Sequence, residues 1–217
     1  MTTIVGPFVV LNICMGNICR SPMAERILAH EVRERLGDRG EEYVLSESAG
    51  TGGWHAGEAM NPPAAKELRR RGVLESGFRA RKLMGSHLDT ADLVLTATAE
   101  QLDFVAGLRA DALDRAFVLG EFGRLIRRVD VSALPVLDET PQGAVAYDLL
   151  PTVAAVHERG VALVRAVNVV RDGADPNPGD DLDDPWGRSD AFFTRTADDI
   201  STSIEALVDA LLPKSGR

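Results

Sequence analysis

The chain has 217 residues, which suits one domain or one domain with an insertion, and its 45% hydrophobic and 26% charged content is ordinary for a soluble globular protein. Its net charge of −9 argues against nucleic acid as a partner, and its two cysteines are too few for a disulfide scaffold. There is no run of about 18 apolar residues and no signal-peptide pattern, so we expect a cytoplasmic protein without membrane insertion.

The first predicted elements are a strand and a helix joined by a short turn. After a leader over residues 1–7, the apolar, β-prone run Phe8–Ile13 predicts a buried strand. Ser21 followed by Pro22 is typical of a helix N-cap and first helical residue, which predicts a helix over Pro22–Leu36. The turn between them begins at Cys14 and carries Arg20 six residues later.

This turn has the chemistry of an anion site. Its backbone N–H groups point inward and adjoin the positive end of a helix dipole. The same field favours the thiolate form of Cys14, which is a nucleophile, and the Arg20 guanidinium can hold two phosphate oxygens. The simpler alternative for Cys14, an inert core cysteine, does not account for the glycine, the arginine and the Ser-Pro pair that follow it.

Strands and helices alternate as far as about residue 120. Strands are expected over Tyr43–Ser48, Leu93–Thr96 and Ala116–Leu119, a glycine-rich loop over Ala49–Met60, and helices over Pro62–Arg71 and Glu100–Leu108. The alternation predicts an α/β fold in three layers, with a four-stranded parallel sheet flanked by helices and the phosphate-binding loop after strand one. Ligands in such sheets bind at the carboxyl ends of the strands, where Cys14 falls.

The pattern changes over about residues 121–180. This region predicts a mainly helical insertion in one domain that spans residues 1–217. Its expected elements are helices over Glu121–Arg128 and Leu149–Val167, a turn over Pro135–Pro141, and a loop over Arg171–Arg188 that leads to a terminal helix over Asp190–Leu212. Our hypothesis is that the insertion narrows the choice of substrate or forms a surface for a partner.

The nine residues Cys14-Met15-Gly16-Asn17-Ile18-Cys19-Arg20-Ser21-Pro22 closely resemble the active-site loop of low-molecular-weight protein tyrosine phosphatases of bacterial type, here with an extended region before the later Asp-Pro-Trp loop. The resemblance implies that Cys14 is the nucleophile and that Arg20 stabilises the transition state. It implies that the backbone from Met15 through Gly16, Asn17, Ile18 and Cys19 to Arg20 binds the phosphate oxygens. It also implies that Ser21 donates to the Cys14 sulfur, and that Cys19 forms a reversible disulfide with Cys14.

Two further blocks extend the resemblance. Asp184-Pro185-Trp186 looks like the Asp-Pro-aromatic motif of the family, whose aspartate protonates the leaving group as general acid. Asp180, Asp181 and Asp183 are close in sequence, and only the Pro-Trp context selects Asp184. The block Ser48–Gly57 resembles the family's loop after strand two, which makes Trp54 a wall of the pocket opposite Trp186.

The resemblance also implies a network that supports the loop, and it shows departures. Asn17 and Ser48 should hydrogen-bond, with Glu25 as a further member, whereas Arg81 is either a matching family position or a solvent-exposed base. Phe78 stands where the family usually has a supporting histidine, and Thr98 stands where it often has an aspartate.

The function implied by the resemblance is hydrolysis of phosphate monoesters, with protein phosphotyrosine as the expected substrate. The reaction passes through a phosphocysteine intermediate and releases inorganic phosphate. We expect no cofactor. We also expect no metal, because the loop and Arg20 neutralise the phosphoryl charge and the four histidines lack ligand spacing. The expected partner is a phosphorylated protein or peptide.

Three alternatives stay open. An arsenate reductase that uses an external low-molecular-weight thiol shares this fold and loop. A phosphocysteine carrier of a sugar transport system holds phosphate on a similar cysteine but has no use for Asp184. A non-catalytic phosphoprotein-binding module needs only the anion site.

Overall fold

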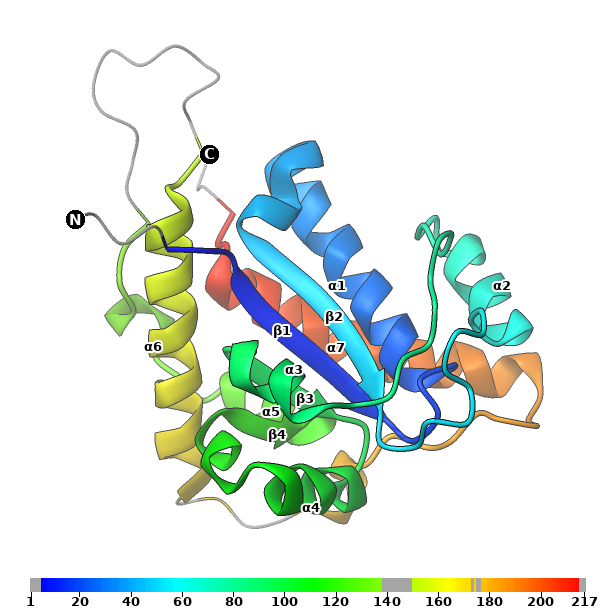
Figure 1. Ribbon diagram of the computed structural model, residues 1–217. Coiled ribbons are helices and arrows are strands. Elements are labelled where there is room, and N and C mark those ends of the chain that lie inside the picture. The colour runs from blue at the N-terminus through cyan, green and yellow to red at the C-terminus, as the bar shows by residue number, and fades with distance from the viewer. Residues whose placement is uncertain (1–4, 138–149, 173, 175–176, 215–217) are drawn as a thin grey trace.

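The computed structural model describes residues 5–137, 150–172, 174 and 177–214. Four parallel strands form one sheet in the order β2-β1-β3-β4 (Figure 1). The strands are β1 (Phe8–Cys14), β2 (Val44–Gly50), β3 (Leu93–Thr96) and β4 (Ala116–Val118). The predicted α/β fold with a four-stranded parallel sheet is confirmed.

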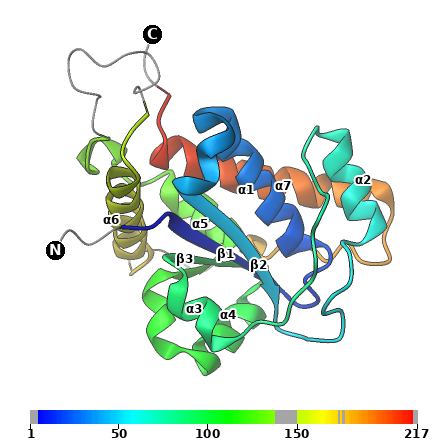
Figure 2. The same cartoon turned by 45° about the horizontal axis from the view of Figure 1, so that its top comes forward.

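Helices cover both faces of the sheet. They are α1 (Arg20–Leu36), α2 (Pro62–Arg70), α3 (Gly85–Thr90), α4 (Ala99–Leu108), α5 (Leu119–Ile126), α6 (Val153–Asp172) and α7 (Asp190–Leu211). Short 3-10 helices span Gly37–Glu42, Ala110–Arg115, Val131–Ala133 and Pro178–Asp180. Figure 2 shows α1 and α7 on one side of the sheet and α3 and α4 on the other, which gives three layers.

The alternation of side chains along β1 divides the core in two. Phe8 and Val10 belong to the apolar cluster that contains residues of α1, α5 and α7, whereas Leu11 and Ile13 belong to the cluster that contains residues of α3 and α4. Because its side chains alternate between the two faces of the sheet, β1 contributes to both clusters. Its last residue, Cys14, lies opposite Gly50, the last residue of β2.

The start of α1 corrects the sequence prediction. We expected Ser21 to be the N-cap, but the N-cap is Cys19 and the helix begins at Arg20. The Ser21 hydroxyl is engaged with the Asn17 amide and the Cys14 sulfur instead of the helix backbone. Pro22 is tolerated within the first turn because its missing N–H would have had no partner there.

Helix α6 is displaced from its predicted span. It starts at Val153, after Pro151, and continues to Asp172, so Arg171 lies in the helix and not in the following loop. Leu149 lies outside the described residues. The Arg171 guanidinium donates to the carbonyls of Leu113 and Ala116 and lies over the Phe117 ring, contacts that favour the longer helix.

The helices of the predicted insertion are part of the main core. Val156, Leu163, Val164 and Val167 of α6 are buried in the same apolar cluster as Phe8. A Cβ atom on Gly160 would lie 2.5 Å from the Phe8 ring, so glycine permits close contact between α6 and β1 at this point. Removing this region would therefore open the core.

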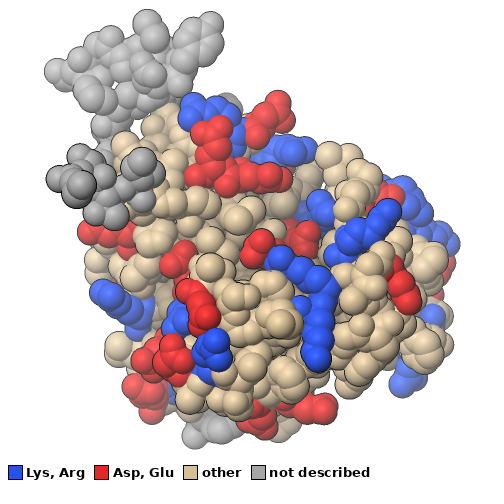
Figure 3. Space-filling model, viewed as in Figure 1, with Lys and Arg blue, Asp and Glu red and all other residues tan. Residues whose placement is uncertain are grey.

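The surface in the view of Figure 3 carries acidic and basic side chains interspersed with one another. The net charge of the chain is therefore not gathered into one continuous acidic field on this face. Within the described ranges, no helix is both long enough and apolar enough to cross a membrane.

Candidate active site

Three loops at the carboxyl edge of the sheet enclose a cavity of about 230 Å³. They are the β1–α1 turn, the loop after β2 and the loop before α7. The lining residues are Cys14, Met15, Gly16, Ile18, Cys19, Arg20, Trp54, His55, Asp184 and Trp186. The structure therefore brings together the thiol, the guanidinium, the carboxylate and both indoles that the sequence singled out.

Asn17 fixes the shape of the β1–α1 turn from beneath. It is fully buried and has a φ of +54°, a left-handed conformation that asparagine adopts more readily than most residues. Its amide nitrogen donates to Ser21 Oγ at 2.9 Å and to Ser48 Oγ at 2.8 Å. Its Oδ1 accepts from the backbone N–H of Arg81 at 2.8 Å. Asn17 is not among the residues that line the cavity, and its side chain holds the turn, Ser48 and Arg81 together.

Ser48 and Arg81 complete this support. Ser48 Oγ donates to Glu25 Oε2 at 2.5 Å, and the Arg81 Nε atom donates to the Ser48 carbonyl at 2.7 Å. Arg81 also lies 3.3 Å from the Glu47 carboxylate, so it belongs to the network and is not a free surface base. Burial raises the pKa of Glu25, opposed by its bond from Ser48 and by the nearby arginines.

The two departures from the family pattern have separate structural outcomes. Phe78 is buried in the apolar core, with the Arg26 guanidinium 5.9 Å from its ring centroid. The hydrogen-bond network around Asn17 forms although Phe78 stands in place of the histidine. Thr98 is the N-cap of α4, but its side chain makes no capping bond. Asp181 instead reaches across from the late loop and accepts from the N–H of Ala99 at 2.8 Å.

Gly50 allows the loop after β2 to approach the turn. A Cβ atom at this position would lie 2.7 Å from the Met15 carbonyl oxygen and 3.0 Å from the Asn17 nitrogen. The two loops are joined by backbone bonds from Thr51 to the Cys14 carbonyl and from Gly52 to the Met15 carbonyl, both 2.9 Å. A side chain at position 50 would therefore collide with the backbone of the β1–α1 turn.

The two cysteines lie in different environments. The Cys14 sulfur is 3.0 Å from Ser21 Oγ, whose hydroxyl can donate to a thiolate. Burial, together with the charges of Cys14 and Asp184, raises the pKa of Cys19 to about 12 although Arg20 lowers it. Cys19 is therefore a thiol at neutral pH, which leaves Cys14 as the candidate nucleophile. Both thiols are free.

Arg20 is the first residue of α1 and its side chain is only 6% exposed. Its Nη1 donates to the Leu182 carbonyl at 3.2 Å, and its Nη2 lies 3.0 Å from Asp184 Oδ2. Its Nε is buried and has no hydrogen-bond partner among the described residues. The guanidinium therefore has a donor to spare beside the Cys14 turn.

The four acidic residues of the late loop separate clearly. Asp180 forms a two-point ion pair with Arg124, and Asp181 caps α4. Asp183 lines a different surface depression, beside Phe192 and Arg195. Only Asp184 lines the cavity that contains Cys14. Of the four carboxylates, Asp184 is thus the one that shares a cavity with the Cys14 thiol.

Trp54 and Trp186 form exposed walls of this cavity. Their exposed fractions are 65% and 64%, which is unusual for side chains of this size and leaves both rings available to a ligand. The sequence did not select His55, which also lines the cavity and has its Nδ1 2.8 Å from Glu58 Oε2. The sequence feature that could have identified His55 is its position next to Trp54, which was predicted to form a wall of the pocket.

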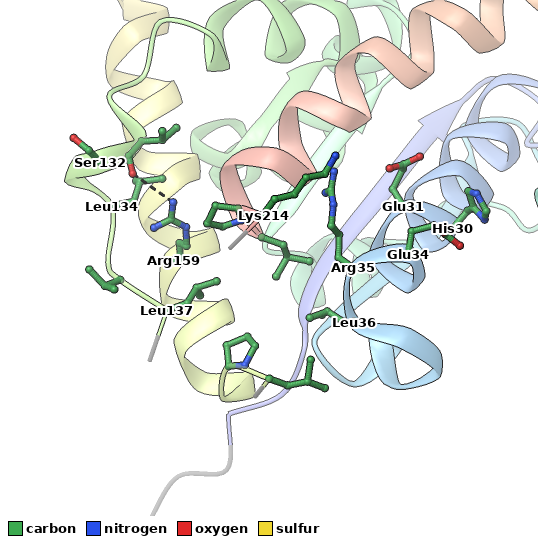
Figure 4. Close-up of a pocket in the computed structure, with 16 residues that line it drawn as sticks. His30, Glu31, Glu34, Arg35, Leu36, Ser132, Leu134, Leu137, Arg159 and Lys214 are labelled. Carbon is green, nitrogen blue, oxygen red and sulfur yellow. Dashed lines mark hydrogen bonds between the residues drawn. The ribbon is translucent and has the colours of Figure 1, made fainter. Parts of the chain in front are cut away.

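A larger cavity, of about 990 Å³, lies at the other end of α1 (Figure 4). Arg159 faces it from α6, but its guanidinium already donates to the carbonyls of Ala210 and Pro135. Arg35 faces it from α1 and is paired with Asp209 at 2.8 Å. The described lining contains no thiol, so this cavity does not offer the chemistry of the Cys14 turn.

Comparison with known proteins agrees with this geometry. The sequence model of the family described as low molecular weight phosphotyrosine protein phosphatase matches residues 9–136. YfkJ of Bacillus subtilis, a low molecular weight protein-tyrosine-phosphatase, is 39% identical over 93 residues, which are 43% of this chain and 58% of the relative. Low molecular weight protein-tyrosine phosphatase A of Mycobacterium tuberculosis is 38% identical over 131 residues, which are 60% of this chain and 64% of the relative.

Solved structures share the fold. The YwlE arginine phosphatase from Geobacillus stearothermophilus matches with a TM-score of 0.60 and 23% identity, over 94% of this chain and 92% of the other. A low molecular weight protein tyrosine phosphatase from T. tengcongensis gives a TM-score of 0.61 and 23% identity, over 93% and 97%.

The α/β fold, with Cys14 at the end of β1 and Arg20 at the start of α1, is the arrangement that the sequence resemblance implied. Since the family model covers more than half of the sequence, the chain belongs to the low molecular weight phosphotyrosine protein phosphatase family. The sequence matches span less than two thirds of the length of these two relatives.

Proposed function

We propose that the protein hydrolyses phosphate monoesters through a phosphocysteine intermediate, with protein phosphotyrosine as substrate. The observation that carries the proposal is the convergence of Cys14, Arg20 and Asp184 on one cavity of about 230 Å³. This set supplies a nucleophile, a positive clamp and a proton donor, the three groups that the reaction needs.

In the first step the Cys14 thiolate attacks phosphorus. An S–P bond forms and the P–O bond to the leaving group breaks, while the Asp184 carboxyl gives its proton to the departing oxygen. Arg20 and the N–H groups of the turn hold the three other phosphoryl oxygens, whose charge changes in the transition state.

In the second step water attacks phosphorus. The Asp184 carboxylate, now deprotonated, takes a proton from the water as the new P–O bond forms. The S–P bond breaks, inorganic phosphate is released, and Cys14 leaves as a thiolate that accepts a hydrogen bond from the Ser21 hydroxyl, 3.0 Å away.

The two exposed indoles support an aryl ester over an alkyl ester. Trp54 and Trp186 offer flat apolar walls on which an aromatic ring can stack, and the serine side chain has no ring to place there. The relatives named above are called tyrosine phosphatases, whereas one structural neighbour is an arginine phosphatase. Phosphoarginine therefore belongs in any substrate test.

The other functions considered use less of the site. A phosphocysteine carrier and a phosphoprotein-binding module have no need for Asp184 in the cavity. Arsenate reduction by an external thiol uses Cys14 and Arg20 but not two aromatic walls.

The two free cysteines suit a reducing compartment, which supports a cytoplasmic location.

The test is turnover of a panel of phosphopeptides that carry phosphotyrosine, phosphoserine or phosphoarginine, with phosphate release as the readout. We expect the wild-type protein to prefer phosphotyrosine and the Cys14→Ser protein to be inactive yet still bind the peptide. Full activity of Cys14→Ser would exclude the phosphocysteine route. Preference for phosphoarginine would retain the mechanism and replace the substrate.

A further inference from the structure

The segment that leads to Asp184 is tied to the body of the protein by residues that the proposed chemistry does not use. Asp180 is bonded to Arg124 and Asp181 to the N–H of Ala99. The N–H of Leu182 donates to the Ala97 carbonyl at 2.8 Å. Three consecutive residues are therefore anchored to α5, to the start of α4 and to the end of β3.

The strongest of these ties is the pair of Arg124 and Asp180. Arg124 Nε lies 3.0 Å from Asp180 Oδ1, and Arg124 Nη2 lies 2.6 Å from Asp180 Oδ2. Two parallel bonds between a planar guanidinium and a planar carboxylate fix orientation as well as distance. Asp180 is only 9% exposed, so water screens the pair less than a surface pair, and its bonds raise the pKa of Arg124.

The backbone is arranged to allow this contact. A Cβ atom on Gly120, in the first turn of α5, would collide with the carbonyl oxygen of Asp180. Glycine at this position lets the late loop lie directly on the start of α5. Asp180 thus contacts α5 through its backbone at Gly120 and through its side chain at Arg124, and the two contacts together restrict movement of the loop at Asp180.

Beyond Asp184 the chain folds on itself. Asp184 Oδ1 accepts from the N–H of Trp186 at 3.1 Å, the Pro185 carbonyl accepts from the N–H of Arg188, and Gly187 has a φ of +71°. This turn sets the local shape around Asp184 but is not itself a link to the sheet. Arg20 also bonds to Asp184 and to the Leu182 carbonyl. The ties at residues 180–182 limit where the turn can sit, because Asp184 is at most four residues from them, a reach of about 14 Å.

We propose that the ion pair of Arg124 and Asp180 positions Asp184 for proton transfer, with Arg124 and Asp180 as positioning residues. This inference rests on the proposed function of Asp184. The pair joins residues near the two ends of the region 121–180, so this proposal gives the region a role in placing the acid, besides the hypothesis that it narrows substrate choice or forms a surface for a partner. Loss of the pair removes acid assistance while the Cys14 turn stays intact.

The experiment compares two aryl esters in Arg124→Gln. Phenyl phosphate has a poor leaving group that needs a proton, whereas 4-nitrophenyl phosphate has a good one. We compare kcat/KM, which covers the steps up to cleavage of the P–O bond and excludes the later attack of water that both esters share. We expect kcat/KM for phenyl phosphate to fall about 10-fold or more and kcat/KM for 4-nitrophenyl phosphate to fall less than about 3-fold, since general acid assistance is worth about 10²–10⁴ in rate. Arg124→Lys should recover part of the loss because it keeps the charge but not the fork.

Arg127→Gln is the matched control. Arg127 lies at the end of the same helix and donates to the Thr202 carbonyl, not to the late loop. Both esters should be turned over normally by this variant. An equal fall in kcat/KM on both esters in Arg124→Gln, or the same selective fall in Arg127→Gln, would overturn the proposal.

A second measurement does not depend on turnover. The chain contains two tryptophans, so Trp54→Phe leaves Trp186 as the sole reporter on the loop. In this background Arg124→Gln should increase the nanosecond depolarisation of Trp186 fluorescence, and Arg127→Gln should not. Unchanged depolarisation would overturn the positioning role. If the wild type hydrolysed neither ester, the proposed function would fail, and Trp186 alone would decide whether the pair holds the loop.

Discussion

Arg20 Nη2 lies 3.0 Å from Asp184 Oδ2, so the proposed phosphate clamp and the proposed acid are bonded to each other. A phosphate dianion that enters the cavity needs the same guanidinium. Binding therefore exchanges one anionic partner of Arg20 for another and separates Asp184 from its counter-charge. Asp184 then lies beside a dianion, which repels its carboxylate.

Replacing Asp184 by asparagine should strengthen the binding of inorganic phosphate. The new amide has no charge to repel the dianion or to compete for Arg20, and the loss of a partly exposed ion pair corresponds to about 1 kcal/mol, or about fivefold in Kd. Titration calorimetry with phosphate measures the effect. Asp183→Asn is the control for charge alone and should bind as the wild type does. Equal Kd values for Asp184→Asn and wild type would show that the pair does not oppose binding.

Asn17→Ala should destabilise the protein and slow its turnover together. The change removes three hydrogen bonds of a buried side chain and leaves alanine in a left-handed conformation. At about 1 kcal/mol per bond the loss is about 3 kcal/mol, measured by urea unfolding. Asn61→Ala is the comparison, because Asn61 makes no side-chain capping bond at the start of α2. A similar loss in both variants would mean that the bonds of Asn17 under the turn have no special value.

Alkylation should distinguish the two cysteines. Because the pKa of Cys19 is about 12, almost none of it is thiolate at neutral pH, and iodoacetamide should label Cys14 alone in the native protein. Peptide mapping by mass spectrometry reads the result. In urea both residues should be labelled, because the raised pKa of Cys19 depends on its surroundings in the folded protein. Native labelling of Cys19 at the rate of Cys14 would contradict its environment in the structure.

Glu67 should make stability depend on acid pH. It is a residue of α2 that accepts a bond from Thr194 of α7. Its bonds from Arg70, then Arg71 and Thr194, lower its pKa to about 2 against the opposing effect of burial. A carboxylate with a lowered pKa stabilises the fold above about pH 4.5 and loses that contribution as the pH falls towards 2. Glu67→Gln should therefore lower the free energy of unfolding at neutral pH by about 2 kcal/mol.

The pH series provides the control for Glu67. The difference between Glu67→Gln and wild type should shrink as the pH falls from about 4.5 towards about 2, where wild-type Glu67 becomes protonated. Glu42→Gln removes an exposed partner of Arg39 and should change little at any pH. A gap between Glu67→Gln and wild type that stays constant over this whole range would assign the loss to packing instead of charge.

The sequence was sufficient for features that are local. The strand Phe8–Ile13 is an almost uninterrupted apolar run, and the turn from Cys14 to Pro22 is contiguous, so its chemistry can be recognised without a fold. Trp54 and Trp186 were placed on one pocket by resemblance, and the structure brings them together.

Features set by distant contacts could not be predicted in the same way. The end of α6 depends on the contacts of Arg171 with Ala116 and Leu113, 55 and 58 positions away. The start of α1 depends on local bonds of Ser21 to Asn17 and Cys14, which compete with the expected capping role of Ser21. The sequence selects Asp184 among the four aspartates of the late loop only by the Pro-Trp residues that follow it. The reason that Asp180 and Asp181 are engaged elsewhere lies in their bonds from Arg124 and from the N–H of Ala99. Most of these partners lie tens of residues away along the chain, beyond the range of propensity or periodicity.

Arg20 and Asp184 are 164 positions apart along the sequence. During synthesis the Cys14 turn leaves the ribosome long before the loop that carries the acid, and α7, which packs on α1, comes later still. The chemistry is therefore divided between an early and a late part of the polypeptide. A nascent or truncated chain that lacks the late segment carries the proposed nucleophile without the proposed acid, so the proposed site is complete only after that segment has been synthesised.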